Sequence, residues 1–544
     1  MRPPAHHTPI TWHTTAFPLN KKKKTHANLK VATLNIRGQS ATNTSGNNNK
    51  WRDLNQVLRD THTGIIALQE THLTEEIVDD IHALFGSRMK VIFSQGDNPR
   101  AAGIAFVINK DLSIHQGIVT HELIPGRALL MSIPWHSNLL LTILNVYAPN
   151  APPENERFWQ KLSDALDSQL VPYPNILLGD FNMVEDVIDR LPSHSDNANT
   201  CNALSDLKKQ LEVKDGWRAH NGNEKGYTYT QKPNMIRSRL DRIYTTDRVF
   251  ETATDWDIST PPIETDHCLM SVRISDPSLP WSGPGRWKLP SFLLKDHTFK
   301  AEAKRLTKKL EDDISKIQAR THNNNPQLLF KTFKDNIKND AIARAKVAIP
   351  KITKTIITLK QDHQKIINDL TLTDLEKMAK AGPIQNKITQ LEQKKFQKAK
   401  TRTKTHFTLE GETVSKYWSN LNRERRQRDP IFSLRKPDAN PPKFETNSTR
   451  MAEIARKYHE DLLTAGLHPD EAEREAIIDT VLGDIPDNSI LPDPEKTEMD
   501  APVDTDIVQL ALKESANDTS PGINGLPYEF WKMLAAPDNP PPAA

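Results

Sequence analysis

Short apolar runs rich in Ile, Val and Leu recur from about Leu29 to Ile274, each bounded by Gly, Asn, Asp or Pro. Runs of this length and composition, closed by turn residues, predict β-strands. Helical patterns are fewer and do not alternate strictly with the strands, so we expect an α/β domain built around packed sheets and not a simple doubly wound sheet. The strand-like runs are Val31–Ile36, Ile65–Leu68, Val91–Phe93, Ile104–Ile108 and Leu139–Val146, and the helical ones are Trp51–Asp60, Glu75–Leu84, Glu154–Ser168 and Asn202–Leu211.

Another apolar run, Ile176–Leu178, is ended by Gly179 and followed at once by Asp180 and Asn182. Because side chains alternate along a strand, Asp180 and Asn182 are expected on one face, with Phe181 on the other. A carboxylate and an amide at a strand end can activate a water and hold a phosphate oxygen. Read alone, this segment is explained better as a polar strand-end turn, so a functional interpretation depends on how the other strands end.

Polar residues end the other strands with the same regularity. They are Asn35 in Leu-Asn-Ile-Arg-Gly, Glu70 in Gln-Glu-Thr, Tyr147 in Asn-Val-Tyr-Ala-Pro, Asp241 in Ser-Arg-Leu-Asp-Arg-Ile, and Asp266 with His267 in Thr-Asp-His. Any one of these is ordinary, because strand ends are often polar. Together they form a constellation within one domain-sized span.

The residue types suit hydrolysis of a phosphodiester. This anionic group repels nucleophiles, so its hydrolysis needs charge neutralisation and an in-line water. Glu70 is the best candidate ligand for Mg²⁺, which is usually held by one or two carboxylates plus waters and substrate phosphate. Asn35 can help to position the metal or the phosphate, and Tyr147 is placed to donate a hydrogen bond to phosphate.

These motifs, in this order over about residues 29–275, resemble the endonuclease/exonuclease/phosphatase family. The closest branch is the apurinic-type endonuclease of non-LTR, LINE-like retrotransposons. The resemblance implies a four-layer α/β-sandwich, in which two packed β-sheets are flanked by helices. Thr265 stands where many relatives carry Ser, so a hydroxyl is retained before the Asp-His pair.

The resemblance also implies roles for the site residues. Asp180 activates the attacking water, Asn182 orients that water or the scissile group, and His267 contacts the phosphate. Asp241 or Asp266 holds the His267 tautomer and favours its charged form; Asp266 is otherwise a second acidic group near the metal or leaving oxygen. Thr228 in Gly-Tyr-Thr-Tyr resembles a phosphate-contacting Thr of the family, and an ordinary strand residue is an equal alternative.

The expected activity is Mg²⁺-dependent nicking of one DNA strand, with Mn²⁺ as a second candidate ion. DNA is the expected partner and the element's own RNA a further candidate, whereas no membrane and no obligate protein partner are expected. One alternative keeps the fold and changes the substrate to abasic DNA, RNA or a small phosphate ester. Another is a catalytically silent nucleic-acid-binding remnant, but none of the motif residues is eroded.

The rest of the chain is expected to contain linkers and charged helices. Pro-rich segments mark the linkers, and Gly382-Pro383 is expected to separate two helices. Between Lys394 and Lys404 lie six basic residues and no acidic one, so this helix surface is either solvated or in contact with phosphates. The expected parts are a disordered basic tail (1–28), the nuclease domain (29–275), a Pro-rich linker (276–295), a basic helical region (296–428), a Pro-rich and helical connector (429–503) with an acidic loop over 484–502, and the start of a reverse transcriptase (504–544).

Residues Ser520–Trp531 resemble the opening fingers motif of retroelement reverse transcriptases, with Asn524 where Asp is usual. A polymerase needs paired aspartates that bind two metal ions, and the Ala-Asp-Asp sequence of the family does not occur in this chain. We therefore expect a truncated polymerase without reverse transcriptase activity, and poor order after about Asp504.

Composition limits the compartment more than the function. The formal net charge of the 544 residues is only +3, so any nucleic-acid contact depends on local patches. Two cysteines suggest a reducing compartment. No apolar run approaches the length of a membrane span, and the N-terminus lacks the apolar core of a secretory signal. The basic block Lys21–Lys24 belongs to a disordered tail, a transit peptide or a nuclear signal; a chromosomal DNA substrate implies the nucleus.

Overall fold

The structure is a computed structural model. It describes residues 25–38, 49–96, 98, 102–135, 139–168, 171–231, 236–276, 279, 281–282, 287–347, 351–410, 431, 433–437, 439–465, 471–483, 485–486, 492–517, 521–522 and 524–536. The chain forms two compact units, which are described separately. The sandwich unit comprises described residues of 27–279 and 346–432, and the helical unit those of 1–26, 280–345 and 433–544.

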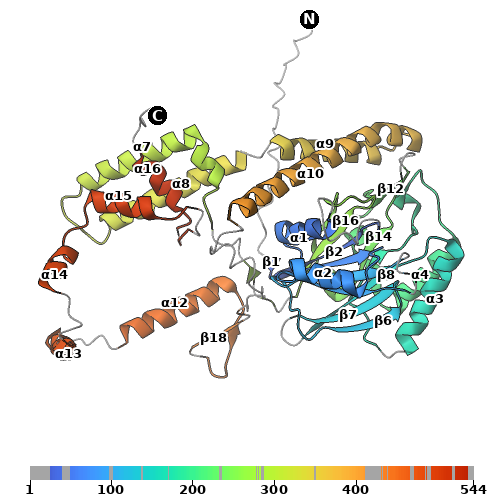
Figure 1. The fold of residues 1–544 in the computed structure, drawn as a ribbon, viewed down its shortest axis with the longest axis horizontal. Helices are drawn as coiled ribbons and strands as arrows, with labels where there is room; N and C mark the ends of the chain where they lie inside the picture. Colours follow the sequence, from blue (N-terminus) through green and yellow to red (C-terminus); the bar gives the residue numbers. More distant parts are fainter. Residues whose placement is uncertain are drawn as a thin grey trace, which may run out of the picture. The chain divides into compact units, whose positions relative to one another are not determined.

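Two six-stranded sheets form the centre of the sandwich unit (Figure 1). The first has the order β15-β16-β2-β3-β5-β4 and the second β11-β14-β9-β8-β7-β6. Only β2–β3 and β8–β9 pair in parallel within these two sheets; the other neighbours are antiparallel. The strands are β2 Asn28–Asn35, β3 Ile65–Gln69, β4 Met89–Ser94, β5 Ile104–Asn109, β15 Thr254–Ser259 and β16 Leu269–Ser275, then β6 Val119–Ile124, β7 Ala128–Pro134, β8 Leu140–Tyr147, β9 Ile176–Asp180, β11 Val213–Asp215 and β14 Asp241–Thr246.

Helices cover the outer face of each sheet, which confirms the expected four-layer α/β-sandwich (Figure 1). The first sheet is covered by α1 Lys50–Thr61 and α2 Glu75–Phe85, and the second by α3 Pro152–Ser168 and α4 Ala198–Gln210. Smaller elements of the sandwich unit are α5 Gly216–Asn221, α6 Asp247–Thr252, a 3-10 turn at Val187–Asp189, and a three-stranded sheet of β10 Arg190–Leu191, β13 Ile236–Ser238 and β12 Tyr229–Gln231.

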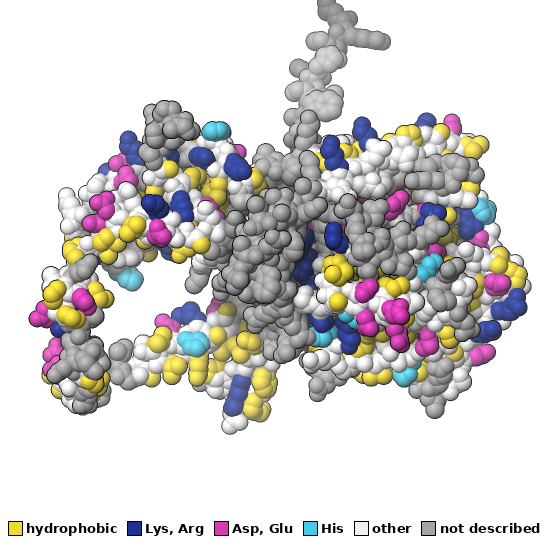
Figure 2. All heavy atoms as spheres, viewed as in Figure 1, with side chains coloured by type: hydrophobic (Ala, Val, Ile, Leu, Met, Phe, Trp, Pro, Cys, Tyr) yellow, Lys and Arg dark blue, Asp and Glu magenta, His cyan; other side chains and the backbone are white. Residues whose placement is uncertain are grey.

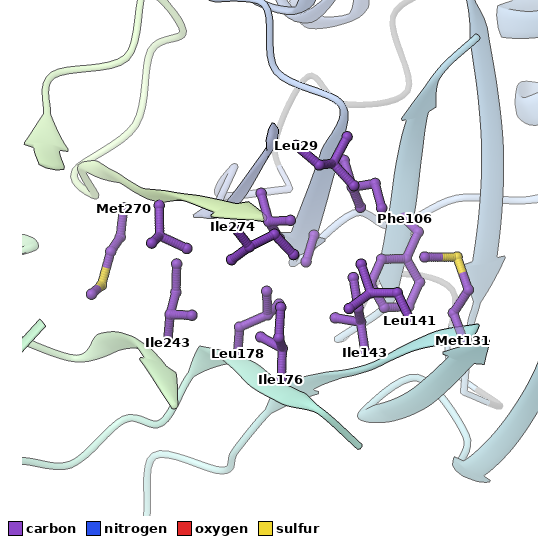
Figure 3. Packing of buried hydrophobic residues seen from close by; sticks show 14 of the residues in the cluster. Leu29, Phe106, Met131, Leu141, Ile143, Ile176, Leu178, Ile243, Met270 and Ile274 are labelled. Carbon is purple, nitrogen blue, oxygen red and sulfur yellow. The ribbon is translucent and has the colours of Figure 1, made fainter. Parts of the chain in front are cut away.

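The main apolar core lies between the two sheets. Side chains of β16, such as Met270 and Ile274, face those of β9 and β14, such as Leu178 and Ile243 (Figure 3). Alternation along one strand supplies two layers at once: Val31 of β2 enters this core, whereas its neighbour Ala32 packs under α1 and α2. Each fully buried aliphatic side chain contributes about 1.5–3 kcal/mol to folding.

Two long helices complete the sandwich unit. They are α9 Lys351–Asn368 and α10 Asp374–Glu410. The expected break at Gly382-Pro383 is wrong, because α10 continues through Pro383. A proline inside a helix removes one main-chain hydrogen bond, and the remaining bonds of this 37-residue helix carry it past that point. In the basic stretch between Lys394 and Lys404, the side chains from residue 398 onward lie outside the described residues, as does the further basic segment Arg423–Arg428.

The helical unit has its own apolar cluster, in which Phe299, Phe333 and Ile337 pack with Leu526 and Phe530. The expectation of poor order after Asp504 is therefore wrong for the described residues of α16, since this helix supplies buried partners to α7 and α8. The expected loop at 484–502 is also wrong in part, because it contains α14. The elements are β1 Thr25–His26, β17 Trp281–Ser282, a 3-10 turn at Ser291–Lys295, α7 His297–Ser315, α8 Pro326–Val347, β18 Leu434–Arg435, β19 Phe444–Glu445, α12 Ser448–Thr464, α13 Glu471–Gly483, α14 Asp493–Met499, α15 Thr505–Glu514 and α16 Tyr528–Ala535.

Among the helices that the structure describes, none combines the length and the apolar character that a membrane crossing requires.

Candidate active site

The polar strand ends meet at one edge of the two packed sheets. Strand pairing brings them there: Asn35 lies opposite Gln69 in the parallel pair β2–β3, and Tyr147 lies opposite Asp180 in β8–β9. Asp241 then pairs with Asp180 from the other side, in β14–β9. Residues far apart in the sequence thus become neighbours, because each lies at the end of its strand that reaches this edge of the sheets.

Asn35 joins two carboxylates at the centre of the site. Its Nδ2 donates to Glu70 Oε1 and to Asp180 Oδ2, both at 2.9 Å. Tyr147 Oη donates to the same Glu70 oxygen, also at 2.9 Å. Asn35 itself is almost fully buried, and its Oδ1 accepts from the backbone N–H of Arg37 at 2.9 Å. The Asn35 amide therefore lies between two negatively charged carboxylates and donates one N–H to each of them.

His267 and Asp241 form a buried pair beside this group. His267 Nδ1 lies 2.8 Å from Asp241 Oδ2, and His267 Nε2 lies 4.0 Å from Asp180 Oδ2. Burial disfavours the charged imidazole, but the charge and hydrogen bond of Asp241, with Asp180 and Asp266, outweigh it and raise the pKa of His267 to about 10. At neutral pH His267 is a cation that faces the Asp180 carboxylate across a gap.

Asp180 is placed to exchange a proton near neutral pH. Burial and the neighbouring Asp241 charge raise its pKa to about 6, although His267 and the bond from Asn35 oppose the rise. A general base works best when its pKa lies near the operating pH. Asp180 has that property because it is buried beside a second carboxylate, Asp241.

The backbone is unusual where it enters the site. Arg37, Glu70, His72 and Asn182 all have positive φ, between 47° and 53°. Such conformations are uncommon for residues other than glycine and collect at functional sites. The strand β9 ends at Asp180, so the alternation expected to place Asn182 on the same face as Asp180 does not extend to Asn182.

Asn182 stays beside Asp180 through a local turn. Its N–H donates to Asp180 Oδ1 at 3.0 Å and its Nδ2 donates to Ala148 O at 2.8 Å. Gly179 before it has φ +146°, and a Cβ there would stand 1.9 Å from Val146 O. Only glycine allows β8 and β9 to approach so closely next to the site.

The hydroxyl groups of Thr228 and Thr265 form hydrogen bonds to backbone groups of the site. Thr228 is fully buried, and its Oγ1 accepts from the N–H groups of Leu240 and Asp241 at 3.0 and 2.9 Å. Thr265 Oγ1 donates to Asn35 O at 2.8 Å and accepts from the N–H of His267 at 3.2 Å. Thr228 therefore positions Asp241; its contact with phosphate stays a prediction.

Asp266 stands apart from the buried group. Its side chain is 26% exposed, and its Oδ2 lies 3.5 Å from Arg37 Nη1. The alternatives for the partner of His267 are thereby resolved in the structure: Asp241, not Asp266, makes the hydrogen bond to the imidazole. A role of Asp266 near the metal or the leaving oxygen stays a prediction.

Oxygen ligands for a divalent cation are present at this edge. Asp180, Asp241 and His267 each offer an atom within 4.8 Å of the others. A protonated His267 is no metal ligand, so this trio suits proton transfer and phosphate contact better. The partly buried carboxylate of Glu70 is the hard oxygen donor that Mg²⁺ prefers. Asn35 turns its Nδ2 toward the carboxylates, so in this arrangement it orients Glu70 for an ion at that carboxylate.

Sequence reasoning missed two buried amides that hold the site together. Gln69 Nε2 donates to Asn145 Oδ1 at 2.7 Å, and Asn145 Nδ2 donates to Leu68 O and Ala105 O, each at 3.1 Å. These bonds tie the first sheet to the second directly behind Glu70. The available signal was position: Gln69 precedes Glu70, and Asn145 lies two residues before Tyr147.

We expect Asp241→Asn to lower the pKa of His267 below its wild-type value of about 10. The negative charge of Asp241 stabilises the imidazolium, and without it burial favours the neutral ring. NMR titration of the His267 ring in EDTA measures this. Asp266→Asn is the matched control, because Asp266 is more exposed and its carboxylate pairs with Arg37, so its effect on the pKa of His267 is smaller. An unchanged titration in Asp241→Asn would contradict the assigned pair.

Comparison with known proteins identifies a family and a relative to which this chain is similar. Residues 32–276 match the model of the Endonuclease/Exonuclease/phosphatase family. The chain is 23% identical over 510 residues to the Transposon TX1 uncharacterized 149 kDa protein of Xenopus laevis, covering 91% of this chain and 36% of that protein. The chain thus spans only 36% of the length of this curated relative.

Two solved structures are also similar to part of this chain. The AP endonuclease LMAP from Leishmania major is 16% identical with a TM-score of 0.39, over 46% of this chain and 89% of that one. The endonuclease domain of TRAS1, a telomere-specific non-LTR retrotransposon, is 15% identical with a TM-score of 0.34, over 45% of this chain and 98% of that one.

Proposed function

Since residues 32–276 belong to the endonuclease/exonuclease/phosphatase family, we propose that this chain is a divalent-metal-dependent DNA endonuclease of a non-LTR retrotransposon. It hydrolyses one phosphodiester of one strand and leaves a 3′-hydroxyl. The observation that carries the proposal is the convergence of Glu70, Asn35 and Asp180 with the Asp241–His267 pair at one sheet edge.

The reaction needs a proton acceptor and a cation on either side of the phosphate. Asp180 takes the proton from the attacking water, since it is buried and its pKa lies near neutrality. His267, held charged by Asp241, donates from Nε2 to a phosphate oxygen. The 4.0 Å gap between His267 Nε2 and Asp180 Oδ2 leaves the two groups free of a direct hydrogen bond to each other.

Tyr147 and Asn182 orient the substrate. Tyr147 donates its hydroxyl proton to Glu70, and burial beside that carboxylate raises its pKa well above the ordinary range, so it remains a donor. Asn182, held in the left-handed conformation beside Asp180, is placed to orient the water or the scissile group. Both roles follow from position next to Asp180 and Glu70.

Mg²⁺ is the proposed ion, with Mn²⁺ as a substitute, and Glu70 would hold it with orientation by Asn35. When bound, the ion neutralises charge that develops on the phosphate oxygens. Asp266 is the proposed additional acidic group on the exposed side of the site.

The retrotransposon assignment is supported by the extent of the transposon relative. Its similarity covers 91% of this chain, so it includes helices outside the sandwich that a small-molecule phosphatase has no need to carry. A nuclear location and contact with the element's RNA belong to the same proposal. Action on abasic DNA remains the alternative, because the same constellation serves any phosphodiester.

The test is nicking of supercoiled plasmid by the purified full chain. We expect relaxed circles in Mg²⁺ and Mn²⁺, unchanged plasmid in EDTA, and nicks that a DNA polymerase extends directly. A duplex with one abasic site and a matched intact duplex separate the alternative: cleavage confined to the abasic strand would replace the proposal by a repair-type activity. A folded chain that leaves all these substrates intact in every divalent metal would overturn both.

A further inference from the structure

The α9–α10 hairpin lies on the nuclease fold, close to the site. Arg237 Nη1 of β13 donates to His363 Nε2 of α9 at 2.7 Å. Gln364 Nε2 donates to Glu224 Oε1 at 2.8 Å and to Lys225 O at 3.1 Å. The N–H of Ser193 donates to Asp374 Oδ2 of α10 at 2.8 Å, so both helices of the hairpin are anchored.

The side-chain contacts that anchor the hairpin on the sandwich are polar, and they bring two lysines close together. Among the described residues, no side chain of α9 or α10 belongs to the three apolar clusters that build the sandwich. Lys377 of α10 is buried beside Lys225, and burial together with this second cation lowers the pKa of Lys225. Like charges and a few hydrogen bonds hold a surface far less firmly than apolar packing.

Arg237 is the centre of this contact, and its charge is not neutralised. It is 2% exposed, and its Nε and Nη2 make no hydrogen bond among the described residues. Two residues further on, Arg239 is equally buried but forms two bonds to Asp189. A buried cation without a carboxylate partner destabilises the structure that buries it. Docking of the hairpin therefore leaves an anion-binding side chain unsatisfied.

The position of Arg237 relates it to the catalytic residues. Within the β12–β13 pair Arg237 lies opposite Thr230, whose N–H donates to Asp266 O at 3.2 Å. The next residue back, Tyr229, forms a β-bridge with His267, and their ring centroids are 4.9 Å apart. Arg237 thus lies one strand away from the Asp266–His267 segment.

We propose that the α9–α10 hairpin is a lid over Arg237, and that a backbone phosphate of bound DNA replaces His363 on this guanidinium when the lid opens. This rests on the proposed function and adds to it a second phosphate subsite, masked in the closed state. A guanidinium matches phosphate bidentately, which a neutral imidazole does not. His363 is such an imidazole, because burial and the charge of Arg237 lower its pKa to about 4.

The lid would also be part of the DNA surface. Its solvent side carries exposed lysines such as Lys354, Lys365 and Lys380. Figure 2 shows Lys and Arg side chains along the edge of the sandwich unit where Figure 1 places α9 and α10. An open hairpin therefore presents cations to the same polyanion that Arg237 binds.

The experiment measures binding of a fluorescent duplex by the full chain in EDTA, over a series of salt concentrations. The double substitution His363→Ala with Gln364→Ala loosens the lid, and we expect affinity to rise roughly 5-fold or more, because the fraction of open chains rises. Adding Arg237→Gln should cancel this gain and lower the slope of log affinity against log salt by about one. Arg237→Lys in the loosened chain should keep most of the slope.

One control variant makes the result decisive. Arg273→Gln removes an arginine of β16 whose Nε lies 3.2 Å from Asp255 Oδ2 and which has no part in the proposed lid, so it should not cancel the gain. An affinity that does not change in the loosened chain, or a gain that persists in Arg237→Gln, would overturn the lid. Binding in EDTA is separate from catalysis, so a wild-type chain that binds DNA but does not nick it refutes the proposed function alone.

Discussion

We expect Glu70→Ala, Asp180→Ala and His267→Ala each to slow plasmid nicking by about 10²–10³ or more. Glu70→Ala removes the carboxylate that accepts from Asn35 and Tyr147 and that would hold the ion. Asp180→Ala removes the proton acceptor, and His267→Ala removes the cation that faces it.

Conservative variants separate charge from shape at the same positions. Asp180→Asn and Glu70→Gln keep the volume and remove the negative charge, so we expect them to be nearly as slow as the alanine variants. Asp206→Ala is the matched control, because Asp206 is an exposed acid of α4 that pairs with Lys209. Initial rates of relaxed-circle formation measure the effect, and near-normal turnover in Asp180→Ala would contradict its role as base.

Folding of these variants has to be measured and not assumed. The strand-end residues of the site are themselves buried: Asp180 and Asp241 are almost fully inaccessible. His267→Ala leaves Asp241 buried without its cation, which destabilises the chain. His267→Gln keeps a donor for Asp241, so loss of activity with an unchanged melting temperature in that variant isolates the catalytic contribution.

We expect Asp189→Ala to lower the free energy of unfolding of the sandwich unit by about 3–5 kcal/mol. Asp189 is fully buried and accepts from Arg239 Nε at 2.9 Å and Nη2 at 2.6 Å. Arg218 also donates to it, and Arg242 lies 3.7 Å away. Removing this carboxylate leaves two fully buried guanidinium groups in a net positive cluster.

The pH dependence of this effect has a definite sign. Burial opposes ionisation of Asp189, but the hydrogen bond and charge of Arg239, with Arg242 and Arg218, outweigh it and lower its pKa. The stabilisation is therefore present above the unfolded-state pKa of about 4 and is lost as pH falls through the lower folded-state value. Asp189→Ala should lack this acid-dependent loss.

Thermal unfolding from pH 3 to pH 7 measures both parts of the prediction. Asp206→Ala again serves as the control, since an exposed ion pair contributes about 0–1 kcal/mol. A free energy of unfolding within about 1 kcal/mol of wild type for Asp189→Ala would show that Asp215 and Glu185, the remaining acids of the cluster, suffice.

The local pattern of the sequence by itself predicted an α/β domain of packed sheets and most of its elements, and the family resemblance of the motifs implied the four-layer sandwich. Short apolar runs closed by turn residues placed β2, β3, β5 and β8 within a few residues, and helical patterns placed α1 to α4, because such patterns depend only on neighbouring residues. The short sequence motifs also identified the polar residues at the strand ends. Helices α14 and α16 were not predicted. The segment of α14 was expected to be a loop, and the segment of α16 was expected to lack packing partners. Packing partners come from tertiary contacts, which a local pattern does not contain.

Only the tertiary structure decided how those strand ends interact. Asn35 and Asp180 are 145 residues apart, and their hydrogen bond exists because β2 and β9 end at one edge. The choice of Asp241 over Asp266 for His267 depends on strand pairing that no local pattern contains. The burial of Arg237 under His363 likewise joins segments 126 residues apart. Sequence periodicity is a local property, whereas charge, burial and hydrogen bonding at a site are set by whichever distant segments the fold brings into contact.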